Sequence, residues 1–293
     1  MFSGSIPALV TPFRDSNFDE ATFRELVEWQ IVEGSSALVP CGTTGEAATM
    51  PKDEHFRVVR VCVEQARGRV PVIAGAGSND TRVAIENVKA AEAAGADAVL
   101  MVPPYYNRPS QEGIFRHFEA VGQATALPVV LYNIPGRTAV DIATETMARI
   151  VEAFPKQFVG VKDATGNIAR VSAQRAACGA GFTQLSGNDE TALAFNAHGG
   201  VGCISVAANV APRLCAEFQA ACQANDFAKA LAYQDRLFPL YVALFTDASP
   251  GPVKYAMTRV RPGFPGELRL PMTESSAANR AQIDAALAHA GLI

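Results

Sequence analysis

One lysine stands inside a stretch that otherwise has the pattern of a buried strand. The stretch FVGVKDATGN covers residues 158–167, and Lys162 follows three apolar residues and a glycine before the apolar run ends. Burial of an ammonium group is costly unless the charge is paired or neutralised. Burial also favours loss of the proton, and a neutral amine is a nucleophile toward a carbonyl carbon. The residue type and its setting therefore indicate covalent chemistry on a ketone or an aldehyde.

A structural ion pair is the alternative role for Lys162, and Asp163 is the nearest acid in the sequence. Successive side chains of a strand point to opposite faces, so Asp163 is a poor partner for its neighbour. The same alternation puts Val159 and Val161 on the face opposite Lys162. If these valines face surrounding helices, the lysine points into the interior of a barrel formed by the sheet.

Three further stretches carry polar residues where an apolar run ends. CGTTGE offers hydroxyls beside backbone N–H donors and glycines that allow close approach, a combination that suits a carboxylate. PPYYNRP offers two phenols, and LYNIPGRT offers a phenol with an arginine that can hold a carboxylate through two bonds. Each stretch alone also fits an ordinary turn, a packing residue or a surface ion pair. The three stretches cover residues 41–46, 103–109 and 131–138.

Short apolar runs recur along the chain and predict its fold. Helix-like segments with apolar residues at helical spacing separate them, as in residues 19–33, 51–66 and 79–95. Eight strand-and-helix units predict an α/β fold of the (β/α)8 TIM-barrel type, with an open doubly wound sheet as the alternative. Reacting groups of such barrels come from the carboxyl ends of the strands. The expected strands lie in residues 6–12, 36–42, 70–77, 98–105, 128–135, 158–165, 183–189 and 202–209.

The pattern changes after the eighth run. Residues 211–226, 227–245 and 274–291 have helical patterns with no strand between them. We expect a catalytic barrel over residues 1–224 and a helical C-terminal extension over residues 225–293.

Composition excludes several classes of protein. The net charge is −4 and the basic residues are scattered, so we expect no nucleic-acid partner. No apolar window reaches the roughly 18 residues that span a bilayer, and the N-terminus lacks the pattern of an export signal. We therefore expect a cytoplasmic protein without membrane contact. The four histidines form no ligand cluster with acids, which predicts no metal, and the six dispersed cysteines fit a reduced state.

Several motifs together carry a resemblance to a known family. GTTGE, PPYYNRPSQEG, LYNIPGRT, GVKDATGN and ISVAANV resemble the dihydrodipicolinate synthase family of class I Schiff-base pyruvate lyases and aldolases. The likeness covers essentially the whole chain. It implies condensation of pyruvate with L-aspartate 4-semialdehyde in the diaminopimelate route to lysine. It also implies a covalent Schiff base on Lys162 in place of a cofactor, and a homotetramer built as a dimer of dimers.

The resemblance implies catalytic roles for four residues. Lys162 would form an imine with the ketone of pyruvate. Tyr132 would serve as the acid and base, and Thr43 and Tyr106 would complete a proton relay with it. The family lends the last tyrosine across a dimer interface, so Tyr106 would serve the site of a neighbouring subunit. Hydroxyl groups suit such a relay because they both donate and accept protons at neutral pH.

The resemblance also implies substrate-binding and regulatory residues. Thr44 would hold the carboxylate of pyruvate and Arg137 that of the semialdehyde, while the backbone of Gly187 and Ile204 would line the pocket. The family's feedback site for lysine would include His55, Asn79 and Tyr105. In this region the sequence departs from lysine-sensitive members at Ala47, Lys52 and Val83. These departures predict weak or absent inhibition by lysine.

Two other readings compete with the synthase. A sister pyruvate lyase, such as N-acetylneuraminate lyase or a 2-keto-3-deoxy sugar acid aldolase, shares the scaffold and the lysine. Arg137 and Thr43 favour the synthase over these sisters. The second alternative is a barrel that binds pyruvate without catalysis. The relay of Thr43, Tyr132 and Tyr106 speaks against it, because a sensor does not need to move protons.

Overall fold

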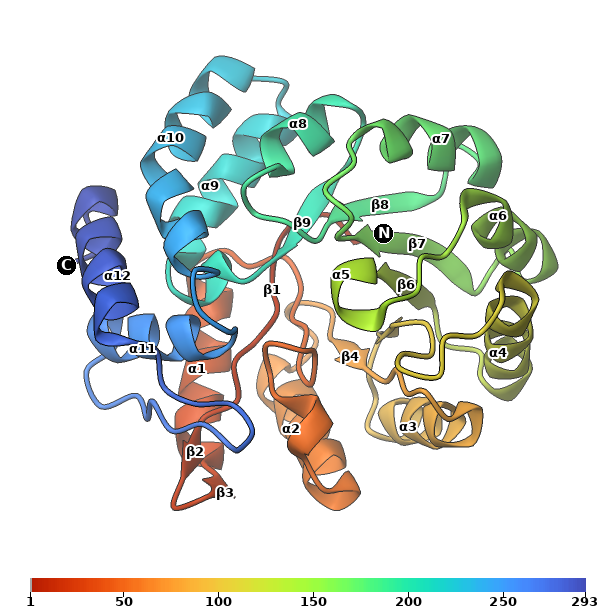
Figure 1. The fold of residues 1–293 in the computed structure, drawn as a ribbon, viewed down its shortest axis with the longest axis horizontal. Coiled ribbons are helices and arrows are strands. Elements are labelled where there is room, and N and C mark those ends of the chain that lie inside the picture. Colours follow the sequence, from red (N-terminus) through yellow and green to blue (C-terminus); the bar gives the residue numbers. More distant parts are fainter. Residues whose placement is uncertain (1) are drawn as a thin grey trace.

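A parallel sheet forms the centre of the computed structural model, which describes residues 2–293 (Figure 1). Each strand is short and nearly all of its side chains are buried, as expected for strands covered on both faces. The strands follow one another in the order β1 (Gly4–Pro7), β9 (Gly202–Ser205), β8 (Thr183–Ser186), β7 (Phe158–Asp163), β6 (Val129–Asn133), β5 (Ala98–Met101) and β4 (Ile73–Gly75).

The segment of residues 36–42 closes this sheet into a ring. Val39 forms a parallel bridge with Ala8, which follows β1, and Leu38 forms another with Val72, which precedes β4. The segment therefore joins the two edges of the seven-stranded sheet. Eight strand segments at the predicted places form a (β/α)8 barrel, and the predicted fold class is confirmed.

Helices cover the outside of the sheet, and three of them begin at a side-chain cap. The carboxylates of Asp19 and Asp80 and the hydroxyl of Ser110 accept backbone N–H groups of the first turn. The outer helices are α1 (Glu20–Val32), α2 (Lys52–Ala66), α3 (Thr81–Ala93), α4 (Gln111–Ala124), α6 (Thr144–Ala153), α7 (Ala169–Cys178), α8 (Ala192–Ala197) and α9 (Pro212–Gln223). Shorter pieces are the hairpin β2 (Phe13–Arg14) and β3 (Asn17–Phe18), the helix α5 (Pro135–Thr138), and the single turns η1 (Ala47–Thr49) and η2 (Ala207–Asn209).

The C-terminal part of the chain is helical, as predicted. Helix α10 (Phe227–Ala243) packs against α9 and α12 (Ala277–Ala290), and these helices lie along one side of the barrel (Figure 1). Helix α11 (Gly251–Val260) was not among the predicted helices, because its first residues are Gly and Pro, which also mark turns. The division of the chain at residues 224 and 225 stays a prediction.

Two separate apolar clusters lie on the two faces of the sheet. The outer cluster fills the space between strands and helices and includes Leu131, Val161 and Phe158. The inner cluster fills the barrel. Its buried members are Ile6, Ala8, Ala37, Val39, Ile73, Ala98, Leu100, Val130, Tyr132, Leu185 and Ile204.

A register shift in β7 corrects one sequence-based expectation. Val129 of β6 pairs with Phe158, but Val130 pairs with Gly160, so Val159 is an extra residue in the ladder. Val161 lies in the outer cluster as predicted, whereas Val159 packs against the inner cluster. The expectation that both valines face the helices is therefore wrong for Val159, because strict alternation fails at a β-bulge.

All six cysteines are unpaired, and five of them are buried. Within residues 2–293, no helix combines the length and apolar character that a membrane crossing requires.

Candidate active site

Lys162 and Tyr132 lie side by side on the inner face of the barrel. They are directly paired in the parallel register of β6 and β7, and only 4% and 6% of their surfaces are exposed. The Nζ atom of Lys162 lies 4.1 Å from the centre of the Tyr132 ring. Within the described part of the chain, this Nζ has no hydrogen bond or ion pair. The structure therefore holds a nearly buried amine without a counter-ion, next to a phenol.

Asp163 points away from the amine, as the alternation along the strand predicts. Its carboxylate accepts the side chain of Gln174 at 2.6 Å, the hydroxyl of Thr165 at 2.6 Å and the Nε of Arg170 at 3.3 Å. These partners belong to the segment after β7 and to helix α7, outside the barrel. The alternative of a structural Lys162–Asp163 ion pair is therefore excluded by the geometry.

A cavity of about 210 Å³ opens above Lys162 at the carboxyl ends of the strands. Six of the predicted site residues line it: Lys162, Tyr132, Thr43, Thr44, Arg137 and Gly187. The guanidinium of Arg137 is exposed and, among residues 2–293, bonds to no other side chain. It is therefore free to receive a carboxylate that enters the cavity.

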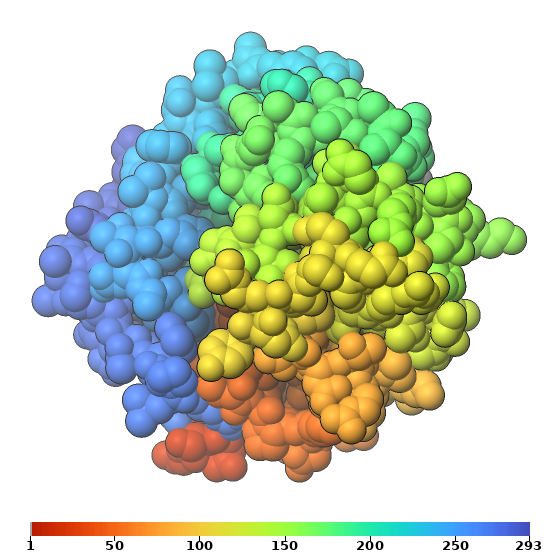
Figure 2. All heavy atoms as spheres, turned by 45° about the vertical axis from the view of Figure 1, so that its right-hand side comes forward, coloured from red at the N-terminus to blue at the C-terminus, as the bar shows by residue number. Residues whose placement is uncertain are grey.

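Two predicted residues do not line this cavity. Tyr106 is 90% exposed, and the yellow loop of residues 102–110 that carries it lies uncovered on the face shown in Figure 2. Ile204 lies in the inner cluster of the barrel together with Tyr132 and Leu185. The roles of Tyr106 and Ile204 stay predictions.

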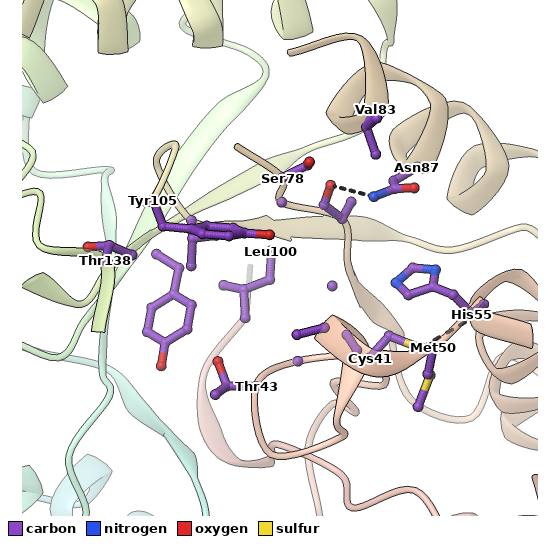
Figure 3. Close-up of a pocket in the computed structure, with 18 of the residues that line it drawn as sticks. Cys41, Thr43, Met50, His55, Ser78, Val83, Asn87, Leu100, Tyr105 and Thr138 are labelled. Carbon is purple, nitrogen blue, oxygen red and sulfur yellow. Dashed lines mark hydrogen bonds between the residues drawn. The ribbon is translucent and has the colours of Figure 1, made fainter. Parts of the chain in front are cut away.

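A second cavity of about 400 Å³ lies beside the first, and Thr43, Tyr132 and Arg137 border both. Figure 3 shows His55 and Val83 pointing into this space from α2 and α3. Burial lowers the pKa of His55 below its ordinary value, so the ring is neutral at pH 7.

Only two of the three predicted regulatory residues line this second cavity. His55 and Tyr105 line it, whereas Asn79 is not among the lining residues. The carbonyl of Asn79 accepts the side-chain amide of Asn107 at 2.9 Å. Ala47, Lys52 and Val83, the departures from lysine-sensitive members, all line the cavity.

The loop that carries Thr43 and Thr44 is held by its own backbone and by the segment that follows the first strand. The N–H of Glu46 donates to the carbonyl of Thr43 at 3.1 Å, and the hydroxyl of Thr11 donates to the carbonyl of Gly45 at 2.8 Å. A Cβ atom at Gly45 would lie 2.9 Å from the carbonyl oxygen of Leu9. Glycine is therefore required there for the loop to approach the barrel.

A buried ion pair fastens the end of this loop to the C-terminal extension. The carboxylate of Glu46 pairs with the ammonium of Lys254 on α11, and both groups are almost completely buried. The ammonium also donates to the carbonyl of Glu267 at 2.6 Å, and the N–H of Arg269 donates to Glu46 at 3.0 Å. Desolvation lowers the pKa of Lys254, an effect that the adjacent Glu46 carboxylate opposes. Sequence analysis missed this pair because its members lie 208 positions apart.

The cavity also contains residues that sequence analysis did not single out. Ile134, Ala164 and Val206 add apolar surface, and Phe245 and Ser249 come from the C-terminal extension. Asn188 and Glu190 follow Gly187 directly, so their place after a strand was a signal that could have identified them. Phe245 and Ser249 carry no such signal, since only tertiary packing brings them to the cavity.

Among the described residues, no three His, Cys, Asp or Glu side chains converge in a way that could hold a metal ion. The charged groups that line the smaller cavity are one lysine, one arginine and one glutamate. A buried amine, a phenol and hydroxyl groups are suited to covalent chemistry on carbonyl compounds with proton transfer. This fold and this site define the class of (β/α)8-barrel lyases that work through a lysine Schiff base.

Comparison with known proteins specifies the family within this class. The model of the dihydrodipicolinate synthetase family matches residues 1–290, and the chain belongs to this family. It is 66% identical over 292 residues to the 4-hydroxy-tetrahydrodipicolinate synthase of Rhizorhabdus wittichii, with 100% of both chains covered. It is 60% identical over 294 residues to the synthase of Brucella suis, again with 100% of both chains covered.

Solved structures agree with this assignment. The chloride-inhibited dihydrodipicolinate synthase of Acinetobacter baumannii, complexed with pyruvate, superposes with a TM-score of 0.95 at 42% identity, over 100% of both chains. The dihydrodipicolinate synthase of Aquifex aeolicus superposes with a TM-score of 0.96 at 39% identity, over 99% of both chains.

The Glu46–Lys254 pair leads to a prediction about stability. Lys254→Met leaves the Glu46 carboxylate buried without a counter-ion, and we expect it to lower the free energy of unfolding by about 3–5 kcal/mol. The control is Arg213→Met, which breaks the more exposed pair with Glu33 and should cost less than about 1 kcal/mol. Urea denaturation followed by circular dichroism measures both. Equal losses in the two variants would contradict the prediction.

Proposed function

We propose that the cavity above Lys162 is the active site for the condensation of pyruvate with L-aspartate 4-semialdehyde. The reaction is that of the family, gives 4-hydroxy-tetrahydrodipicolinate, and belongs to lysine and diaminopimelate biosynthesis. The family works through a lysine Schiff base without a cofactor. The observation that carries the assignment of the site is the unpaired, nearly buried amine of Lys162, which faces a cavity beside Tyr132.

The first step forms the covalent bond to pyruvate. The amine nitrogen of Lys162 adds to the ketone carbon, and loss of water from the adduct leaves an imine. Thr44 lines the cavity and is almost fully buried, so its hydroxyl and N–H are the groups we assign to the carboxylate of pyruvate. The protonated imine nitrogen then withdraws electrons from the neighbouring methyl group.

The second step moves a proton through Tyr132. Loss of a proton from the methyl group gives an enamine, and the phenol beside Lys162 is placed to exchange protons with the bound substrate. Thr43 borders both cavities and can connect Tyr132 to the exterior. Tyr106 is exposed and does not line the cavity of its own chain, so we assign it to the site of a second copy of the chain.

The third step joins the two substrates. The enamine carbon attacks the aldehyde of the semialdehyde, whose oxygen takes up a proton and becomes a hydroxyl group. The amino group of this adduct then attacks the imine carbon and displaces Lys162, which regenerates the free amine and closes the ring. Arg137 at the rim of the cavity is the residue we assign to the carboxylate of the semialdehyde. The remaining assignments concern backbone positions, Gly187 at the cavity wall and Ile204 below it.

The proposal includes the assembly and the location of the enzyme. A tyrosine that is lent between subunits requires at least a dimer, and we propose the homotetramer, a dimer of dimers, that the resemblance implies. The exposed position of Tyr106 supports an interface at its loop. We propose a cytoplasmic location, where both substrates would be made.

Two measurements test the proposed function. Sodium borohydride in the presence of pyruvate reduces the imine to a stable amine, and peptide mass spectrometry should find the added mass on Lys162 alone. A coupled assay should then show turnover with L-aspartate 4-semialdehyde. A label on another residue would refute the site, and turnover restricted to sugar aldehydes would refute the substrate.

Removal of the Tyr132 hydroxyl should slow catalysis without unfolding the barrel. We expect Tyr132→Phe to lower kcat by about 100-fold or more, which is the usual scale for loss of a general acid and base. The ring stays in place, so borohydride should still trap pyruvate on Lys162. Steady-state kinetics measures the effect, and an unchanged kcat would remove Tyr132 from the mechanism.

The second cavity predicts weak or absent inhibition by lysine. Val83 points into the cavity shown in Figure 3, where it offers no charge to the amino group of an inhibitor. His55 and Tyr105 remain, but neither supplies a carboxylate. We expect lysine at millimolar concentration to leave the initial rate nearly unchanged. The variant Val83→Glu is the matched test, since it restores a carboxylate, and strong inhibition of the unmodified enzyme would contradict the prediction.

A further inference from the structure

The loop that follows β8 is held rigidly at the edge of the smaller cavity. The N–H of Gly187 donates to the carbonyl of Asp163 at 2.7 Å. The carboxylate of Asp189 accepts the N–H groups of Val206 and Ala207 at 3.0 and 3.1 Å. These bonds tie the loop to β7 on one side and to the start of η2 on the other. The backbone from which side chains enter the cavity is therefore held in place.

Glu190 ends this loop, and its carboxylate is left largely unused. Its backbone carbonyl accepts the side chain of Gln234 at 2.9 Å, which fixes the main chain. The carboxylate receives one hydrogen bond, from the amide of Asn188 at 3.2 Å, and has no ion pair within residues 2–293. The side-chain oxygen of Asn188, Oδ1, is buried and receives no hydrogen bond. The exposed carboxylate of Glu190 therefore keeps several free acceptor positions, and the amide of Asn188 orients it.

The charges around the cavity are complementary to an amino acid. Arg137 and Lys162 are its cations, and Glu190 is its single anion. L-Aspartate 4-semialdehyde carries a carboxylate and an ammonium group on one carbon, and an aldehyde two carbons away. Arg137 suits the carboxylate and the enamine on Lys162 suits the aldehyde. Neither suits the ammonium, which needs groups that only accept hydrogen bonds.

We infer that Glu190, supported by Asn188, binds the ammonium group of the second substrate and selects amino aldehydes over aldehyde acids without an amine. An ammonium has three N–H donors, and the exposed carboxylate of Glu190 supplies two oxygens that can accept them. Charge-assisted bonds of this kind are stronger than neutral ones. This inference rests on the proposed function, because it names the part of the site that reads that substrate.

The test compares two ligands that differ only in the amino group. The kcat/KM for L-aspartate 4-semialdehyde is measured beside the inhibition constant of 4-oxobutanoate, which keeps the carboxylate and the aldehyde. We expect Glu190→Gln to lower kcat/KM at least five-fold and to change the inhibition constant less than two-fold. The KM for pyruvate should stay the same. Glu25→Gln, an exposed glutamate of α1 outside the cavity, is the matched control and should change none of these values.

A second variant distinguishes loss of ammonium binding from general damage to the site. Arg137→Gln removes the carboxylate-binding group that both ligands share, so it should weaken both by similar factors. Equal losses for both ligands in Glu190→Gln, or no loss for either, would overturn the role of Glu190. Absence of turnover by the unmodified enzyme would refute the proposed function. This result is distinct from a failure of the Glu190 proposal, which requires an active unmodified enzyme. Borohydride trapping of pyruvate on Lys162 confirms in each variant that the barrel is folded.

Discussion

The register between β6 and β7 is the constraint on which the site depends. Val159 is one residue more than the ladder needs, and it shifts every later residue of β7 by one position. If the ladder instead continued in strict one-to-one pairing from Val129 and Phe158, Tyr132 would pair with Val161, and the lysine would pair with Asn133 and face the outer helices. The bulge thus decides that Lys162 shares the inner face with the phenol, while Asp163 is turned outward to Gln174 and Arg170.

Around this pair, the site is assembled from loops that are fixed by buried polar contacts. The Asp189 carboxylate ties the loop after β8 to η2, and Glu46 ties the threonine loop to α11. Each of these carboxylates is costly to bury, and each is matched by backbone N–H groups or by an ammonium. The cavity that they frame keeps its own charges unpaired at Arg137 and Lys162, where substrates supply the complementary groups.

Local patterns in the sequence predicted much of this arrangement. Apolar runs predicted the eight strands, and the alternation between Val161 and Lys162 holds in the structure. Six predicted residues meet at one cavity, of which Gly187 was named from the resemblance alone. Strict alternation was wrong at Val159, because a bulge is decided by how two strands fit together. The Glu46–Lys254 pair and the contribution of Phe245 to the cavity could not be predicted from local patterns, because each depends on contacts between distant segments. The roles of Tyr106 and Ile204 came from the resemblance alone.

The buried pair between Glu46 and Lys254 also has a consequence for the timing of synthesis. All eight strand segments leave the ribosome before α11 does, so a nascent chain can close its barrel while Glu46 still lacks its counter-ion. The contacts of Glu46 with Lys254 and Arg269 form only when residues 254–269 are present. A chain truncated before this point therefore keeps Lys162 but leaves the Glu46 carboxylate, at the end of the threonine loop, without its counter-ion.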